Sequence, residues 1–439
     1  ILFLKEYMCG IIGSINYEEK LNPENSEWVK SKINMLIHRG PDDKKIWTSE
    51  KENIIFGHTK LSIIDLSNKN VQPMNDDDNK ITLTYNGEIY NYLKLKKELS
   101  KDYSFITNSD TEVIIKSYLK WGEKFLNKIE GMFAFALFDE REKIIYLARD
   151  RMGEKPLFYL SNEKFFLFSS ELSSFYSLSN IDKKNLNETL LNGFPLIKDN
   201  TLLKNVSQVE PGEFIKINLK EGKFFKKKYW NLDLKINLKS SINEKEFEEI
   251  LNSNIENCFI SDVKTCVTLS GGLDSSLITS IASKQKKIDT FTIVFKNQKF
   301  DERDHALKIS KYFQTNHNEV EIEDYSLDQI LDIIERLDIP IIDSSIIPSF
   351  VLFNNLRANN YKVAIGGDGG DEIFGGYNHY RIFNKIDLVK KKFFNLNIPF
   401  LNFLTKKLET FSLMVHPTLL LIQTETEVMK RKHQMGGQL

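Results

Sequence analysis

Apolar residues change their spacing about halfway along the chain. From Cys9 to about residue 230 they fall in short alternating runs between turn residues, a pattern typical of antiparallel strands. Helical spacing occurs over residues 29–37 and 110–120, where Ser109 and Glu112 have the spacing of a capping box. We therefore predict a first domain, residues 9–225, with many strands and few helices. The predicted strands are residues 81–85, 132–138, 143–149, 157–160 and 165–169.

The second half alternates strand-like and helix-like segments instead. Such alternation predicts βαβ units and a doubly wound parallel sheet, which we assign to a second domain, residues 240–439. The boundary is expected in the polar, lysine-rich stretch 220–243. The predicted strands are residues 265–269, 289–295, 317–322 and 361–365, and the predicted helices are residues 275–284, 302–312, 327–337 and 348–359.

Composition narrows the function classes. The chain has 439 residues, 41% of them hydrophobic, and a formal net charge of −1, so it lacks the basic excess expected of a nucleic-acid-binding protein. Its 3 cysteines are too few for a disulfide framework, and we expect a cytoplasmic protein. Apolar stretches such as residues 132–138 are far shorter than the ~18 residues of a membrane span, and we expect neither a membrane segment nor a targeting segment.

Residues 270–276 (SGGLDSS) lie between a predicted strand and a predicted helix. Paired glycines let backbone N–H groups approach an anion, and the helix N-terminus favours negative charge, so the loop suits phosphates. No Gly-Lys-Ser/Thr follows, which excludes a Walker loop and suggests that pyrophosphate leaves with the help of a metal held by Asp274. The alternative is a glycine turn in which Ser275 caps the helix.

A second cluster of glycines and acids, residues 366–377, follows the strand 361–365. Loops at the carboxyl ends of neighbouring parallel strands can face one another across one crevice. Asp371 and Asp274 would then share a magnesium ion, which prefers carboxylate, water and phosphate oxygens. The alternative is a flexible acidic surface loop.

Cys9 follows the first methionine of the chain, Met8. If Met8 is the initiator and is removed, the thiol and a free α-amino group belong to one residue. An α-amino group has a pKa of about 7.7–8.0 and can act as the base for the thiol. We therefore expect the mature chain to begin at the nucleophile Cys9. The alternative is a buried, inert cysteine.

Nine short motifs together indicate a family. The first half contains residues 9–13 (CGIIG), 38–42 (HRGPD), 57–65 (GHTKLSIID), 86–91 (NGEIYN), 109–112 (SDTE) and 131–136 (GMFAFA). The second half contains residues 270–276, residues 343–345 (DSS) with Ile347 and Pro348, and residues 367–377 (GDGGDEIFGGY). In this order, over residues 8–381, they resemble the glutamine-hydrolysing asparagine synthetases. The resemblance implies an αββα Ntn-hydrolase glutaminase domain followed by an ATP-pyrophosphatase-type domain, similar to adenine nucleotide α-hydrolases.

The family hydrolyses glutamine at an N-terminal cysteine and passes ammonia through a tunnel to aspartate activated by ATP as β-aspartyl-AMP. The resemblance makes Cys9 the nucleophile, with the Asn86 side chain and the Gly87 N–H as the oxyanion hole. Taken alone, Asn86-Gly87 is a common hairpin turn and Asp110 belongs to a capping box. The residues implied to bind glutamine are Lys60, Leu61, Ile63, Ile64, Asn86, Gly87, Glu88 and Asp110, of which Glu88 and Asp110 bind its ammonium group.

The nucleotide site is assigned to the two glycine-rich loops, with Leu269 and Ile293 beside adenine and Asp368 contacting the intermediate or a water. The implied nucleotide-binding residues are Leu269, Ser270, Gly271, Gly272, Asp274, Ser275, Ser276, Ile293, Gly366 and Gly367. Three positions depart from the family: Lys60 replaces arginine and cannot offer a bidentate fork, Gly366 replaces serine, and Asp368 replaces glutamate. Resemblance also thins beyond Arg381, so we expect an incomplete second domain that lacks a family lysine.

The expected substrates are glutamine, aspartate and ATP, with Mg²⁺, and the sequence leaves a homodimer open. Two other functions fit the same motifs. One is an ATP-dependent amidotransferase acting on another carboxylate, such as a sugar acid or a β-lactam precursor, because the loops specify adenylation and not the acceptor. The other is a regulatory protein that binds glutamine or nucleotide and turns over poorly.

Overall fold

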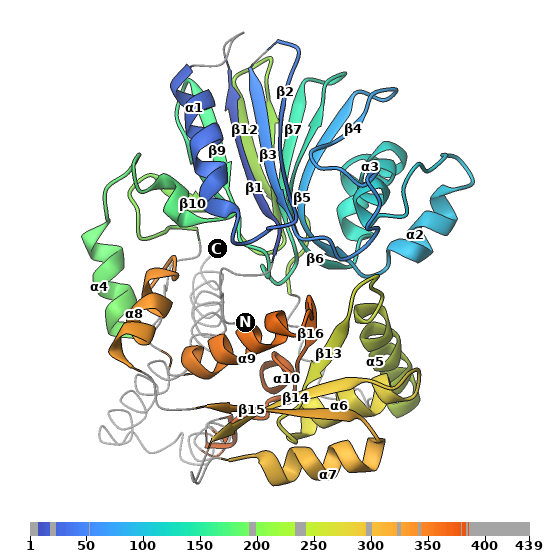
Figure 1. Cartoon of the computed structure of the whole chain (residues 1–439). Coiled ribbons are helices and arrows are strands. Elements are labelled where there is room, and N and C mark those ends of the chain that lie inside the picture. The colour runs from blue at the N-terminus through green and yellow to red at the C-terminus, as the bar shows by residue number, and fades with distance from the viewer. Residues whose placement is uncertain are drawn as a thin grey trace, which may run out of the picture.

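The computed structural model describes residues 8–17, 23–51, 53–192, 199–232, 243–295, 301–322, 326–340, 343, 345–378, 380–382 and 385. Two units stack on one another (Figure 1), the first blue to green and the second yellow to orange. Ser344 of the DSS motif, residues 233–242 of the expected boundary and the chain end from residue 386 lie outside the described residues.

The first unit contains two six-stranded sheets packed face to face, built from antiparallel strands. The order in one is β10-β8-β9-β1-β3-β2, and in the other β12-β11-β7-β6-β5-β4. The first sheet consists of β1 (Gly10–Asn16), β2 (Asp43–Thr48), β3 (Ile54–Lys60), β8 (Phe158–Ser161), β9 (Phe165–Ser169) and β10 (Val206–Gln208). The second consists of β4 (Met74–Asp76), β5 (Ile81–Ile89), β6 (Gly131–Asp139), β7 (Ile144–Arg149), β11 (Glu213–Asn218) and β12 (Lys223–Lys228).

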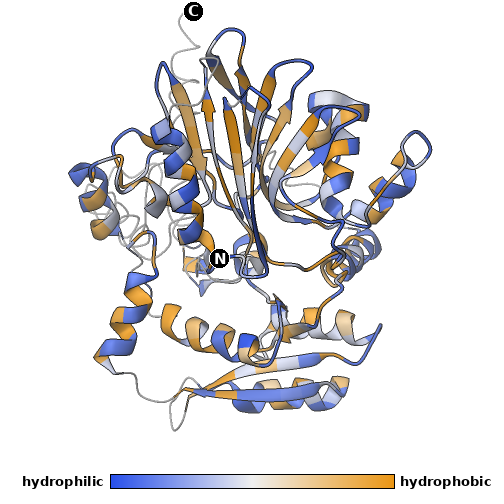
Figure 2. Cartoon of the chain, turned by 45° about the horizontal axis from the view of Figure 1, so that its top comes forward, coloured by the Kyte–Doolittle hydropathy of each residue, from blue (hydrophilic) through white to orange (hydrophobic). Residues whose placement is uncertain are grey.

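Alternating side chains of these strands fill two different layers. On β1, Ile11 and Ile15 enter the core between the sheets, whereas Ile12 packs outward beneath α1 (Pro23–Lys32). The outer face of the other sheet is covered by α2 (Tyr92–Leu99) and α3 (Asp110–Trp121). Figure 2 shows apolar residues concentrated on the strands and polar residues on the outer faces of the helices. The expected αββα arrangement is confirmed.

Several local predictions need correction. Strand β12 continues past the predicted domain boundary at residue 225, because residues 226–228 pair with β11. The apolar stripe over residues 29–37 extends from α1 into a 3₁₀ turn, η1 (Ile33–Leu36), and leaves Ile37 exposed. Only half of the capping box forms: the Ser109 hydroxyl accepts from the Glu112 N–H, but the Glu112 carboxylate binds the N–H groups of residues 106 and 107.

The remaining elements of the first unit are short. They are η2 (Gly122–Asn127), η3 (Leu172–Phe175) and α4 (Lys183–Asn192).

The second unit is a four-stranded parallel sheet in the order β15-β14-β13-β16. Residues of α5 and α6 pack on one face with Val267, and residues of α9 pack on the other with Cys266, so the sheet is doubly wound as predicted. The strands are β13 (Thr265–Thr268), β14 (Asp289–Phe295), β15 (Asn316–Ile322) and β16 (Val363–Ile365). The helices are α5 (Glu244–Cys258), α6 (Leu273–Ser283), α7 (Arg303–Phe313), α8 (Leu327–Glu335), α9 (Ile346–Ala358) and α10 (Gly370–Phe374).

Strand order places the nucleotide loops together. Strand β13 lies between β14 and β16. After β13 the chain forms β14 and β15 on one side of it, and then returns to form β16 on the other side. A ligand crevice forms at such a switch point, beyond the carboxyl ends of the strands. Among the helices that the structure describes, none combines the length and the apolar character needed to cross a bilayer.

Phe166 tests the core between the sheets. Its side chain is 0% exposed and its ring stacks on Tyr159 at 5.1 Å. We expect Phe166→Ala to lower the free energy of unfolding of the first unit by about 3–5 kcal/mol. Denaturant unfolding followed by tryptophan fluorescence measures this unit, because all 4 tryptophans belong to it. Phe225→Ala, at a ring 50% exposed on β12, is the matched control, and an equal loss in both variants would contradict the assignment of this core.

Candidate active site

A cavity of about 300 Å³ lies where the two units meet. The first unit contributes Cys9 and the ends of β3 and β5, and the second contributes residues of α9 and β16. The predicted nucleophile Cys9 and all the residues predicted to bind glutamine line this one cavity: Lys60, Leu61, Ile63, Ile64, Asn86, Gly87, Glu88 and Asp110.

Cys9 immediately precedes β1 and is held from two sides. The Leu61 N–H donates to the Cys9 sulfur at 3.3 Å, and the thiol lies 3.6 Å from the Leu61 carbonyl. The Arg39 guanidinium donates through Nε to the Cys9 carbonyl at 3.0 Å. Burial raises the pKa of the thiol, so the Cys9 thiol needs a base close by to become a nucleophile.

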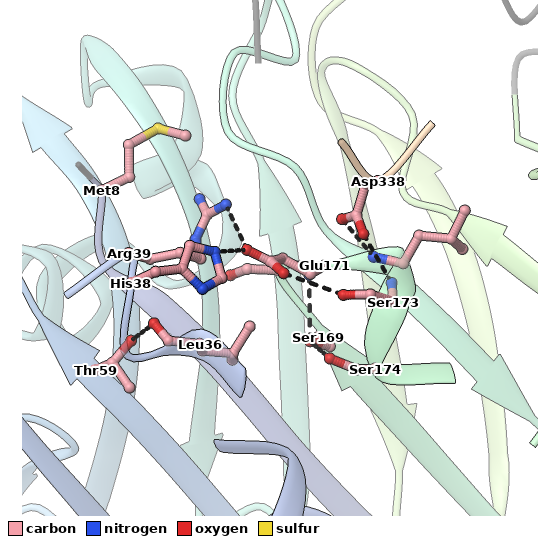
Figure 3. Close-up of polar contacts among 12 residues, drawn as sticks. Met8, Leu36, His38, Arg39, Thr59, Ser169, Glu171, Ser173, Ser174 and Asp338 are labelled. Atoms are coloured by element: carbon pink, nitrogen blue, oxygen red, sulfur yellow. Dashed lines mark hydrogen bonds and ion pairs between the residues drawn. The ribbon is translucent and has the colours of Figure 1, made fainter. Parts of the chain in front are cut away.

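Arg39, which binds the Cys9 carbonyl, also forms a buried ion pair with Glu171 (Figure 3). The Glu171 carboxylate binds Arg39 at 3.4 Å and His38 at 2.7 Å, and accepts from the Ser173 hydroxyl at 3.1 Å. Asp338, from the second unit, accepts from the N–H groups of residues 172 and 173 and so caps η3, directly after Glu171. Neither Glu171 nor Asp338 belongs to a sequence motif, so the sequence does not predict their place in the site.

Asn86 and Gly87 lie inside strand β5, so the hairpin-turn alternative is wrong. They are in register with Ala134 and Phe133 of β6. The Asn86 Nδ2 is buried with no hydrogen-bond partner among the described residues. A Cβ at Gly87 would lie 2.1 Å from the Met132 carbonyl oxygen, so the strands approach too closely for any side chain. A buried donor without a partner, facing the same cavity as Cys9, has the property required of an oxyanion hole.

Glu88 and Asp110 are both buried acids of the cavity. Burial, reinforced by Asp110, raises the pKa of Glu88 to about 8. Burial also raises the pKa of Asp110, although the N–H of Ile89 and the hydroxyl of Tyr85 donate to its carboxylate. Two acids with raised pKa values form a pocket that favours a bound cation such as an ammonium group.

Lys60 ends β3 and is 9% exposed. Its ammonium donates to the Asn70 carbonyl, and burial lowers its pKa. A second buried lysine, Lys155, also lines the cavity. The sequence did not predict it, because it belongs to no recognised motif. Lys155 lies 2.9 Å from the Met8 sulfur, so residue 8 contacts the cavity wall.

The predicted nucleotide loop joins β13 to α6. Gly271 has φ +81°, and a Cβ there would lie 2.6 Å from the backbone of α7, so only glycine fits. The Ser270 hydroxyl contacts the Ser275 hydroxyl at 3.0 Å and accepts from the Gly272 N–H at 3.2 Å. The Ser276 hydroxyl is buried without a partner among the described residues, which leaves a donor for an anion at the start of α6.

The two glycine-rich loops touch one another. A Cβ on Gly370 would lie 2.6 Å from the Asp274 carboxylate, and one on Gly367 would lie 2.9 Å from the Asp274 Cβ. Burial and the neighbouring charges of Asp371 and Glu372 raise the pKa of Asp274. The described residues contain no group of three or more metal-binding side chains. The protein ligands to a metal here would therefore be two carboxylates, those of Asp274 and Asp371. Such a pair suits Mg²⁺ when phosphate oxygens complete the shell.

The remaining predicted nucleotide residues differ in burial. Leu269 is 1% exposed, and Ile293 is partly buried against the core beneath α9. Asp368 is exposed, and a Cβ on Gly366 would lie 2.9 Å from its carboxylate.

The fold and the site define a two-part enzyme scaffold: an αββα glutamine amidotransferase unit joined to a parallel-sheet nucleotide unit. Residues 8–230 match the family described as glutamine amidotransferase domain, and residues 246–419 match asparagine synthase. The chain belongs to the family of glutamine-hydrolysing asparagine synthetases.

Individual relatives agree with the family match. A provisionally named glutamine-hydrolysing asparagine synthetase 2 of Methanocaldococcus jannaschii is 34% identical, over 88% of this chain and 78% of that protein. Glutamine-hydrolysing asparagine synthetase 1 of Bacillus subtilis is 33% identical, over 85% of this chain and 60% of that protein. Amidase chry2 of Gibberella zeae is 28% identical, over 85% of this chain and 60% of that protein. The chain thus spans about three fifths of the length of the last two.

Glu88 should make stability depend on pH. Its pKa is about 8 in the folded chain and about 4.3 in an unfolded one, so the folded state holds an extra proton between these values. The protonated Glu88 therefore contributes its full share to the free energy of unfolding below about pH 4.3. This contribution falls as the pH rises toward 8. Glu88→Gln should remove that fall, measured as the free energy of unfolding at a series of pH values. Glu98→Gln, on the exposed side of α2, is the matched control, and parallel pH curves for parent and Glu88→Gln would contradict the assignment.

Proposed function

We propose that the protein is a glutamine-dependent asparagine synthetase. It hydrolyses glutamine at Cys9 and supplies the ammonia to aspartate, which ATP activates as β-aspartyl-AMP with release of pyrophosphate. The observation that carries the proposal is the cavity between the units, where Cys9 lies with the unpartnered donor Asn86 and the acids Glu88 and Asp110. Family membership supports the same reaction.

The first half-reaction uses groups of the first unit. Once Cys9 is the first residue, its α-amino group takes the thiol proton, and the sulfur attacks the carboxamide carbon of glutamine. Negative charge then develops on one oxygen, where Asn86 Nδ2 and the Gly87 N–H donate to it. Ammonia leaves with the proton, and water hydrolyses the thioester to glutamate. Glu88 and Asp110 hold the substrate ammonium group, while Lys60, Leu61, Ile63 and Ile64 contact its carboxylate and chain.

Asn86→Ala tests the oxyanion hole. We expect kcat for glutamine hydrolysis to fall about 10²–10³-fold with little change in KM, because the lost contact forms only as charge develops. Glutamate release is measured on protein that begins at Cys9, as verified by intact mass. Asn34→Ala, at an exposed asparagine bonded to Lys44, is the control. A rise in KM at unchanged kcat would assign Asn86 to ground-state binding instead.

The second half-reaction uses the crevice between the glycine-rich loops. Residues 270–276 with Gly366 and Gly367 bind the phosphates, and Leu269 and Ile293 lie beside adenine. Asp274 and Asp371 would hold Mg²⁺, which neutralises phosphate charge as pyrophosphate leaves. Asp368 contacts the intermediate or a water.

Asp274→Asn tests this crevice. The neutral amide weakens metal binding, so aspartate-dependent ATP consumption should be lost. Glutamine hydrolysis in the absence of nucleotide should remain within about twofold, because Asp274 does not line the Cys9 cavity. Asp289→Asn, at the opposite end of the sheet, is the matched control. Loss of both activities in a folded Asp274→Asn protein would contradict two separate sites.

The acceptor is the second part of the proposal. The Gibberella relative is named an amidase, so related chains carry names other than asparagine synthetase. Pyrophosphate release with aspartate, compared with sugar acids and other carboxylates, identifies the acceptor, and failure of every acid would favour the regulatory alternative. We place the protein in the cytoplasm, because its three cysteines are free in the structure, and expect neither nucleic acid nor membrane as a partner.

A further inference from the structure

The second unit holds one short segment of the first unit at two points. This segment, residues 61–65, follows β3 and has no strand or helix. Asp262 donates through its N–H to the Ile63 carbonyl at 3.1 Å and accepts from the Asp65 N–H at 2.8 Å. Lys362 binds the Asp42 carboxylate at 2.6 Å, and that carboxylate accepts from the Ser62 N–H at 2.7 Å.

The same segment holds the nucleophile. Leu61 contacts the Cys9 sulfur through both its N–H and its carbonyl, and Leu61, Ile63 and Ile64 line the cavity. A shift of residues 61–65 would therefore alter both the glutamine pocket and the position of the thiol.

Asp262 and Lys362 precede two neighbouring strands that lead to the nucleotide crevice. Asp262 comes shortly before β13 and Lys362 directly before β16, and these strands pair in parallel register from Thr265 with Val363 to Val267 with Ile365. Beyond the strands follow the loops 270–276 and 366–371. From Lys362 to Gly366 the extended chain spans only about 13 Å.

We propose that β13 and β16 act as a rigid link through which nucleotide binding positions the glutamine-binding segment 61–65, with Asp262 and Lys362 as its positioning residues. The inference rests on the proposed function for the identity of the two ligands. The strands are the stiff part, because they are hydrogen-bonded along their length and Cys266 and Val267 are fully buried. Residues 61–65 are the part that shifts, because their hydrogen bonds to Asp42 and Asp262 join them to side chains and to the loop at Asp262.

Thermodynamic linkage sets the size of the expected effect. A coupling free energy is reciprocal, so nucleotide should order residues 61–65 and glutamine should tighten nucleotide binding by the same factor. Couplings between sites are typically at least about fivefold.

Hydrogen exchange measures the order of the segment without relying on turnover. In the full chain, a non-hydrolysable ATP analogue with Mg²⁺ should slow amide exchange over residues 61–67 by about fivefold or more. Lys362→Met and Asp262→Ala should each reduce that change to within about twofold. Tyr176→Phe is the matched control, because it removes another contact between the units, from its hydroxyl to the Asp338 carbonyl at 2.9 Å, and touches neither strand nor segment.

A second readout is glutamine hydrolysis with and without the analogue, in chains that begin at Cys9. The ratio of the two kcat/KM values should differ from one in the parent and in Tyr176→Phe, and approach one in Lys362→Met. Analogue binding is measured by calorimetry on the same samples. If the analogue binds but amide exchange over residues 61–67 does not change, the link alone is overturned. The link is also overturned if the change in exchange is as large in both variants as in the parent. Absence of analogue binding overturns the link together with the nucleotide half of the proposed function, whereas absence of hydrolysis in the parent overturns only the glutaminase half.

Discussion

The ion pair between Arg39 and Glu171 is the constraint on which the site depends. Both side chains are almost fully buried, at 2% and 1% exposure, so neither charge has water to stabilise it. Further hydrogen bonds stabilise such a buried pair, and removing one partner typically costs about 3–5 kcal/mol. Here Arg39 donates through Nε to the Cys9 carbonyl, and Glu171 binds His38 and Ser173, whereas Nη2 of Arg39 has no hydrogen-bond partner among the described residues. Because Asp338 caps the turn that follows Glu171, the second unit helps to fix the geometry around Cys9.

Much of the fold could be predicted from the spacing of apolar residues. Strands β5 to β9 and β13 to β16 have clear patterns because each places apolar residues against a definite layer, such as the core between the sheets or the face beneath α9. Local signals failed where tertiary contacts decide the structure. Asn86-Gly87 is a strong turn signal in isolation, yet both residues pair with β6 in the sheet, which keeps this part of β5 extended. Likewise, the lysine-rich β12 resembles a linker until Phe224 packs into the core.

The candidate site also has a part that the sequence predicts and a part that depends on tertiary contacts. Residues within motifs, from Cys9 to Asp110, could be predicted to meet, and they line one cavity. The loops of the second unit could be predicted to face one another because parallel strands end at the same edge of a sheet. Glu171 and Lys155 could not, since their contacts join residues far apart in sequence within the first unit, and Asp338 could not, since its contact depends on how the two units pack.

The paired acids of the cavity have a consequence for its electrical state. Glu88 and Asp110 both have raised pKa values, since burial and their mutual repulsion disfavour two charges in one enclosed space. Below a pH of about 8, Glu88 therefore tends to hold a proton in place of a charge. A cation that binds to Glu88 displaces this proton, so binding the cation and releasing the proton are one event. In this respect the cavity behaves as an ion exchanger, and the acidity of its surroundings sets how readily a positively charged guest is accepted.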